Sequence, residues 1–192
     1  MSLTVKLPSS LIARRWRKKR GVAAMEFALA LPIWITMLLG CTDGTFMLLL
    51  SQRVDRIAYS VNDILTQSER LAAADIDRTM LAASELMQPF TFGEKGIVIV
   101  TSITKEAGLP PSICWQYSGG GALSRSSLVG SLGGSVALPN GLTLNDNENV
   151  LVTEVYYDFA PLFINASVLS AGDIYRAAVY KPRLSQLCQT PS

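Results

Sequence analysis

The sequence contains no histidine and only three cysteines among its 192 residues. The lack of histidine excludes Ser-His-Asp and Cys-His catalysis and most zinc sites. The cysteines show no CxxC or other metal-ligand spacing. Ser-Lys and paired-carboxylate chemistry stay formally open, but we expect Glu148, Glu154 and Asp158 on the solvated face of a strand region. The sequence therefore predicts a protein that is not an enzyme and has no cofactor or metal.

Acidic residues are absent from the first 20 positions, which hold seven of the 17 basic residues. Between Arg14 and Arg20 every residue except Trp16 is basic. The rest of the chain has ten basic and 15 acidic residues, a net charge of −5. That part lacks a basic patch, so we expect no nucleic-acid partner. The basic run could bind acidic lipid or nucleic acid, but its place beside an apolar segment favours a role in membrane orientation.

Charge is also scarce from Phe27 to Leu50, where Asp43 is the only carboxylate. As a helix, this segment would be about 36 Å long, enough to cross a bilayer with some tilt. The basic block should stay in the cytoplasm. We expect residues 1–21 to form a basic cytoplasmic leader, 22–50 a transmembrane helix and 51–192 a periplasmic domain. The chain would then be a single-pass protein of the bacterial inner membrane, with an exported C-terminal domain.

Gly21 and Glu26 form a pattern at the start of this apolar segment. A carboxylate here is costly unless it is paired or lies near the interface. A cut after Gly21 would make Val22 the first residue and Glu26 the fifth. The new ammonium group and the carboxylate could each be neutralised by a neighbouring subunit, which would fix the register of stacked helices. The pattern resembles the processing site of type IV prepilins; the alternative is an uncleaved signal anchor with Glu26 at the interface.

A second possible processing signal lies in the apolar segment. Leu38–Cys41 resembles a lipobox, which would lead to lipid attachment at Cys41. The apolar stretch before it, about 19 residues, is long for a signal peptide. Processing there would also leave Phe46–Leu50 as an exposed apolar run. A lipid-anchored protein is therefore the less favoured alternative.

Helical periodicity continues beyond the membrane segment. Apolar residues at i, i+3, i+4 and i+7 predict one long helix from about Val22 to about Leu71, with Asn62 and Asp63 on outer faces. A second helix should start near Asp75, a good N-cap residue, and end before Pro89. The predicted core positions of the two helices are Val54, Ile57, Val61, Ile64, Leu65, Leu71, Ile76, Met80, Ala83 and Met87.

The second half of the chain contains short β-rich runs. The clearest one is Val150–Phe159. In this strand Glu154 and Asp158 should face water, and the residues expected to face the core are Leu151, Val155, Tyr157 and Phe159. Between the strands lies Ser118–Ser135, with six glycines and six serines, which we interpret as a flexible connector or a loop that a partner could order. The fold class is α+β, with a small antiparallel sheet. The predicted strands are Ile97–Val100, Ile113–Trp115, Val150–Phe159 and Ile174–Tyr180.

Two cysteines, Cys114 and Cys188, lie in the predicted exported domain. An oxidising compartment would favour a disulfide that closes a long loop and pins the C-terminal tail. Two unpaired buried thiols are the alternative, because spacing alone does not show that the residues meet.

Three segments resemble one family, the TadE/TadG-like proteins of the Tad/Flp tight-adherence pilus systems. Residues 17–34 (RKKRGVAAMEFALALPIW) resemble the family's opening. Residues 152–163 (VTEVYYDFAPLF) resemble its late strand and turn, and residues 177–186 (AAVYKPRLSQ) its final strand. In the last segment Pro182 and Arg183 match without an assigned role. Residues 72–148 carry no matching motif.

The resemblance implies a type IV pilin-like minor pilin or pseudopilin that a prepilin peptidase cleaves between Gly21 and Val22. Its partners would be other pilin subunits, the peptidase and the inner-membrane platform of the pilus, and its role pilus assembly and adhesion. Alternatively, the chain is an unprocessed scaffold of the secretion machine. Under any of these hypotheses Pro161–Ile164 is a candidate contact with a partner, and burial in the core is the alternative.

Overall fold

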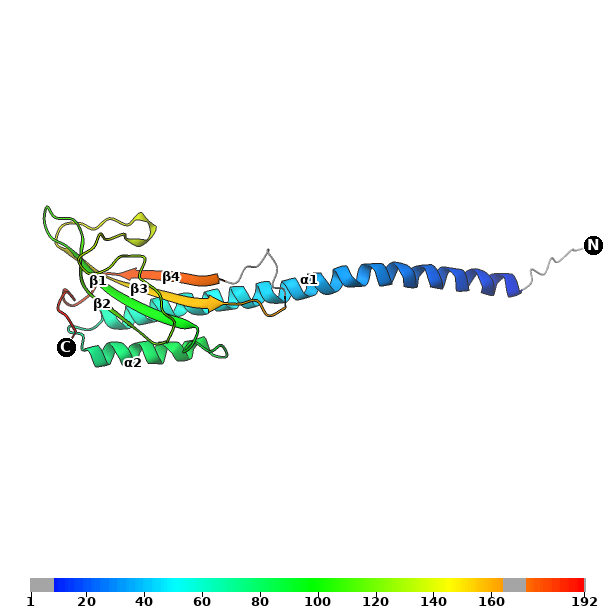
Figure 1. Cartoon of the computed structure of the whole chain (residues 1–192), viewed down its shortest axis with the longest axis horizontal. Helices are drawn as coiled ribbons and strands as arrows, with labels where there is room; N and C mark the ends of the chain where they lie inside the picture. Colours follow the sequence, from blue (N-terminus) through cyan, green and yellow to red (C-terminus); the bar gives the residue numbers. More distant parts are fainter. Residues whose placement is uncertain (1–8, 164–171, 192) are drawn as a thin grey trace, which may run out of the picture.

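The computed structural model describes residues 9–163 and 172–191, with side chains from residue 21 onward. It has the predicted α+β architecture: one very long helix, a shorter second helix and a four-stranded antiparallel sheet (Figure 1). The sheet order is β2-β1-β3-β4. The elements are α1 (Ser9–Thr66), α2 (Ala73–Ser84), a 3-10 turn (Glu85–Met87), β1 (Gly96–Lys105), β2 (Ser112–Gly119), a second 3-10 turn (Pro139–Gly141), β3 (Glu148–Phe159) and β4 (Gly172–Tyr180).

Helix α1 begins and ends earlier than the sequence predicted. It includes the basic block, whose Arg and Lys residues are good helix formers. It also continues through Pro32. It ends at Thr66, whose hydroxyl donates to the carbonyl of Asp63 (3.1 Å) and whose own carbonyl accepts from the Arg183 N–H (3.1 Å). Those bonds satisfy polar groups that a helix terminus leaves open.

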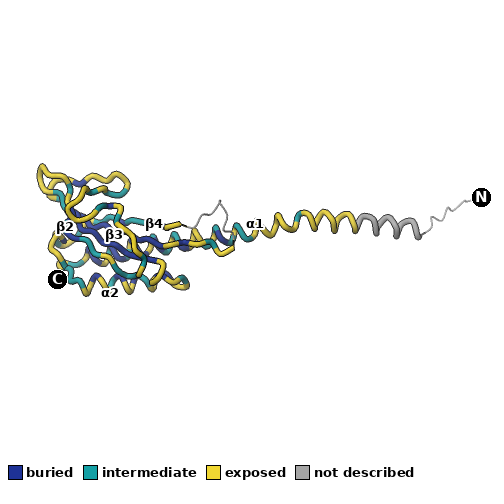
Figure 2. Tube along the Cα trace, in the orientation of Figure 1, coloured by how far each residue is buried: buried dark blue, intermediate teal, exposed yellow. Residues whose placement is uncertain are grey.

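The core lies between the C-terminal half of α1, helix α2 and one face of the sheet (Figure 2). Burial of apolar side chains on these surfaces stabilises the domain. Most of the predicted helix positions are confirmed, but Ile64 is exposed and Leu71 lies beyond the end of α1, where it is only partly buried. Helix α2 starts at Ala73, so Asp75 lies in its first turn and is not the N-cap. The confirmed positions are Val54, Ile57, Val61, Leu65, Ile76, Met80, Ala83 and Met87.

The prediction that Asn62 lies on an outer face is wrong, because its side chain is fully buried. Its Nδ2 donates to the carbonyls of Leu151 (3.1 Å) and Ala178 (2.8 Å), on β3 and β4. A buried amide is tolerated when it is hydrogen-bonded. Asn62 therefore ties α1 to two neighbouring strands.

The interpretation of Ser118–Ser135 as a flexible connector is also wrong. Part of this segment packs on the sheet face opposite α1, where Val129 is buried among residues of β1, β2 and β3. At its start, a Cβ on Gly121 would lie 2.1 Å from the carbonyl oxygen of Gly96. Gly120 has a φ of +78°, which favours glycine. The glycines are thus required by close packing and turn geometry.

Candidate functional site

The N-terminal half of α1 is an uncovered apolar surface. From Gly21 to Thr42, all of which is described, no residue is buried (Figure 2). An 18-residue window within Gly21–Thr66 has a mean hydropathy of 2.0, and none of it is buried. Among the described residues, this is the one helix long and apolar enough to cross a membrane. It is consistent with a single membrane anchor.

The predicted processing residues lie at the start of this surface. Gly21, Val22 and Glu26 are all exposed on the uninterrupted helix. A Cβ on Gly21 would meet nothing within 4 Å, so packing does not explain the glycine. The five-residue spacing to Glu26 corresponds to about 7.5 Å along the axis. A terminus created after Gly21 and the Glu26 carboxylate would thus lie less than two turns apart.

Further along, α1 carries an apolar groove of about 480 Å³. Cys41, the lipid-attachment residue of the less favoured alternative, is free and exposed here. A Cβ on Gly44 would also meet nothing within 4 Å. The groove therefore lies on a face that the folded domain leaves accessible. Its lining residues are Trp34, Met37, Leu38, Cys41, Thr42, Thr45, Phe46 and Leu49.

Counted from Gly21, Asp43 is the first residue of α1 that is buried by the folded domain. Its side chain is fully buried. Oδ1 accepts from the backbone N–H of Leu162 (3.0 Å), and Oδ2 accepts from that of Phe163 (3.1 Å). Sequence reasoning noted this isolated carboxylate but assigned it no contact. Leu162 and Phe163, two of the predicted partner-contact residues, are exposed, whereas Ile164 lies outside the described residues.

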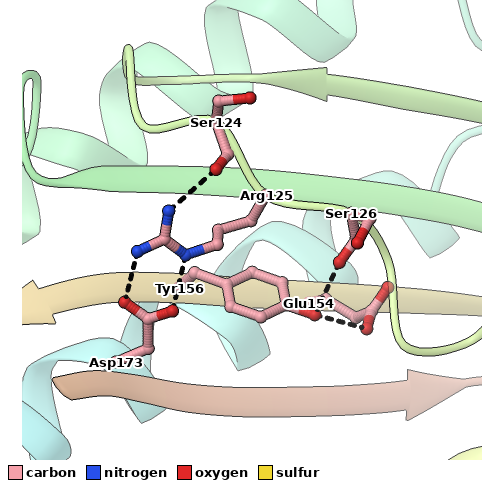
Figure 3. Close-up of polar contacts among 6 residues, drawn as sticks. All are labelled: Ser124, Arg125, Ser126, Glu154, Tyr156 and Asp173. Atoms are coloured by element: carbon pink, nitrogen blue, oxygen red, sulfur yellow. Dashed lines mark hydrogen bonds and ion pairs between the residues drawn. The ribbon is translucent and has the colours of Figure 1, made fainter.

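A second buried carboxylate, Glu154, lies on the opposite face of the sheet (Figure 3). The prediction that it faces water is wrong, although Asp158 is exposed as predicted. Glu154 accepts hydrogen bonds from the Leu128 N–H (2.9 Å), the Tyr175 hydroxyl (3.0 Å) and the Tyr156 hydroxyl (3.3 Å). The Ser127 hydroxyl is a further donor. The donors come from Ser127 and Leu128 in the loop and from tyrosines of β3 and β4. These hydrogen bonds therefore attach the loop around Ser127 and Leu128 to the sheet.

Beside it, Arg125 forms a bidentate ion pair with Asp173 at 2.5 and 2.9 Å (Figure 3). The hydrogen bond from Arg125 holds the pKa of Asp173 below its usual value. Burial, and then the charge of Glu154, raise the pKa values of Tyr156 and Tyr175, so both hydroxyls stay protonated. Because these tyrosines act as donors to a carboxylate with four partners, the cluster resembles a structural pin more than a proton-transfer site.

The C-terminal tail is fixed by covalent and polar contacts. Cys114 and Cys188 form a disulfide, with their Cα atoms 5.2 Å apart. The buried Leu187 offers its carbonyl to the Trp115 indole N–H (2.8 Å) and to the Ser102 hydroxyl (2.6 Å). The tail is therefore held to β1 and β2. Sequence reasoning named the two cysteines but not the surrounding hydrogen bonds.

Among the described side chains, no three His, Cys, Asp or Glu residues are grouped in a way that could hold an ion. The two buried carboxylates, Asp43 and Glu154, are each engaged by hydrogen-bond donors of the chain itself.

The comparisons with known proteins point to the same helix. Neither the curated proteins nor the solved structures include a match to this chain. The model of the TadE-like protein family matches residues 21–61. This match starts at the predicted processing glycine, spans the uncovered half of α1 and extends into the packed half. Residues 21–61 of this chain are therefore similar to the TadE-like protein family.

Proposed function

We propose that this chain is a minor pilin or pseudopilin of a Tad-type (type IVc) pilus, cleaved after Gly21 by a prepilin peptidase. It acts in pilus assembly and surface adhesion. Its partners are other pilin subunits, the peptidase and the inner-membrane platform of the pilus. Before assembly it is anchored in the inner membrane by α1, with the folded domain in the periplasm. The match of residues 21–61 to the model of the TadE-like family supports the link with this pilus system.

The observation that carries the proposal is the exposure of Glu26 on an otherwise apolar helix surface. Burial of a lone carboxylate in lipid or between helices is unfavourable unless a positive group neutralises it. The ammonium group created at Val22 of a neighbouring subunit is such a group. This pairing would stabilise one axial offset between neighbouring helices, because at other offsets the carboxylate and the ammonium group would stay unpaired.

The N-terminal residue and intact mass of the protein, purified from membranes that contain the native peptidase, test processing. A chain that starts at Val22 supports the proposal. A start at Met1 would instead indicate an unprocessed membrane scaffold, and a lipidated Cys41 would indicate a lipoprotein. Either of these results contradicts cleavage after Gly21.

The role of Glu26 is tested separately with Glu26→Gln. Cleavage should be largely retained, while incorporation into sheared pili should fall sharply, because the amide cannot neutralise an ammonium group. The control is Glu106→Gln, which removes an exposed carboxylate in the turn between β1 and β2. Normal piliation in Glu26→Gln would rule out the register mechanism and leave the anchoring role standing.

A further inference from the structure

The contact between Asp43 and the turn after β3 fixes the position of an apolar surface. This surface lies at the base of the domain, where the folded part of the chain meets the uncovered half of α1. Two backbone N–H groups, from Leu162 and Phe163, point at one carboxylate, so the turn is tied to α1 by its main chain. The side chains of these two residues remain free to project. They are 64% and 57% exposed, respectively. The turn thus presents apolar groups outward at a defined height on α1.

That height corresponds to one membrane boundary if Val22 lies at the other. Val22 and Asp43 are 21 residues apart, about 32 Å along a helix, and the hydrocarbon core of a bilayer is about 30 Å thick. Exposed apolar residues continue for one more turn and a half on α1, at Met47, Leu48 and Leu49. We define Met47, Leu48, Leu49, Leu162 and Phe163 as the apolar collar.

The collar is bordered by charged groups of the domain base. Lys95 and Asp158 line a small cavity with Leu162 and Phe46. The two charged residues lie on adjacent segments, since the Asp158 N–H donates to the Lys95 carbonyl (2.8 Å). An apolar surface edged by both signs of charge fits the boundary between acyl chains and headgroups.

We propose that the apolar collar is a lipid-binding surface, seated in the membrane interface on the side of the folded domain. Asp43 is its positioning residue: it holds Leu162 and Phe163 at the level where the apolar span of α1 ends. The domain would then rest on the bilayer through two attachments, the helix and the turn, and its rotation about α1 would be restricted. This inference rests on the membrane-anchoring part of the proposed function.

Continuity selects lipid over a second copy of the chain as the occupant. Leu49 of the collar lines the same apolar groove as Trp34 and Leu38 of the span below it. Any lipid that surrounds this span therefore also reaches the level of Asp43. The collar spans both α1 and the turn, and an exposed apolar patch of this kind marks an interaction site.

Site-specific photocrosslinking tests the proposal in the full-length chain, reconstituted in vesicles of phosphatidylethanolamine and phosphatidylglycerol. Benzoylphenylalanine is placed at Leu162, at Trp34 in the middle of the span, and at Leu184. Leu184 is the matched control, since it is 61% exposed but lies on the C-terminal tail. Lipid adducts are counted by intact mass, and covalent dimers by gel electrophoresis.

We expect position 162 to give about tenfold more lipid adduct than position 184, and position 34 to give adduct as well. If position 34 gives lipid adduct but position 162 gives no more than the background level of position 184, the collar proposal is overturned, whereas membrane anchoring by α1 still stands. Covalent dimers in place of lipid adduct at 162 overturn it in favour of a subunit contact. No adduct at 34 overturns the anchor, and the collar with it.

Asp43 is tested by Asp43→Ala and Asp43→Asn in the chain labelled at 162. The alanine variant should lose several-fold of the lipid adduct at 162 while the adduct at 34 is unchanged. Asparagine keeps an acceptor oxygen and should restore part of the yield. Thermal unfolding followed by near-UV circular dichroism shows whether each variant is folded. An unchanged adduct at 162 in folded Asp43→Ala overturns the positioning role.

Discussion

The two halves of α1 have the same secondary structure but opposite surroundings. Between Gly21 and Thr42 no side chain is buried, whereas Val54, Ile57 and Val61 are completely buried a few turns later. Apart from the exposed Glu26, the first half carries no charged side chain and is largely apolar, which suits lipid or neighbouring helices. The second half carries an apolar stripe with polar residues beside it, which suits a folded core. One helix can thus lie in two environments, lipid and a protein core, when the pattern of its apolar residues changes along its length.

The largest expected effect comes from a matched pair of substitutions, one in each half. Ile57→Ala should lower the free energy of unfolding of the domain by about 2–5 kcal/mol, because it leaves a cavity in the core. Ile33→Ala removes the same atoms from a side chain that is 70% exposed and should leave domain stability unchanged. Urea unfolding in detergent micelles, followed by near-UV circular dichroism, measures both. Equal effects would contradict the division of α1 into two environments.

Removal of the disulfide should affect only the packed part of the molecule. Cys188→Ser opens a loop whose ends are 74 residues apart in sequence. Cross-links over such loops stabilise a fold by about 2–4 kcal/mol, mainly by restricting the unfolded chain. The same urea titration under oxidising conditions should show this loss, and Cys41→Ser serves as the control. If reduction lowers the stability of the wild-type protein but Cys188→Ser does not lower it under oxidising conditions, the assignment of the disulfide to Cys188 is contradicted.

Asn62 tests how the packed half is attached to the sheet. Asn62→Ala removes both hydrogen bonds to the β3 and β4 carbonyls, and should cost about 1–3 kcal/mol. Gln67→Ala is the control, because its hydrogen bond to Asp63 is exposed. Chemical denaturation of the two variants gives the comparison. A cost for Asn62→Ala no larger than that of the control would mean that water replaces the lost bonds.

The smallest effect is expected for the ion pair between Arg125 and Asp173, whose side chains are partly exposed. The pKa of Asp173 is lower in the folded state, so its contribution is present above its ordinary value near 3.8 and is lost as the pH falls below that value. Asp173→Asn should therefore flatten the decline of stability with acid in this range only. A double-mutant cycle with Arg125→Gln, measured near neutral pH and again near pH 3, isolates the pair. A coupling energy that does not change with pH would contradict this assignment.

Features set by local pattern could be predicted from the sequence, and features set by distant partners could not. The stripe of α1 and α2 follows from helical spacing alone, and eight of its positions are buried as predicted. Glu154 and Asn62 look like surface residues in their own segments. Apart from Tyr156, which is two residues from Glu154, their side-chain partners are 21 to 116 residues away in the sequence, so only the folded chain shows why they are buried.

The candidate site divides in the same way. Gly21, Val22 and Glu26 form a local motif, so the sequence alone suggests cleavage and pairing, and both stay predictions. The role of Asp43 depends on a turn 119 residues later, which no local pattern indicates. Similarly, the glycines of Ser118–Ser135 suggested flexibility, whereas Gly121 is needed because another backbone segment passes close by.

The tail after β4 has a mechanical consequence. It connects the end of α1, through Arg183 and Thr66, to the far edge strand β2, through Cys188 and Cys114. Strands β3 and β4 run alongside α1 (Figure 1). Tension along α1 would therefore load their cross-strand hydrogen bonds in shear, many at once, instead of opening them one by one. The tail links both sides of this sheared unit, so a pulling force would have to break a covalent bond before the last residues could separate from β2.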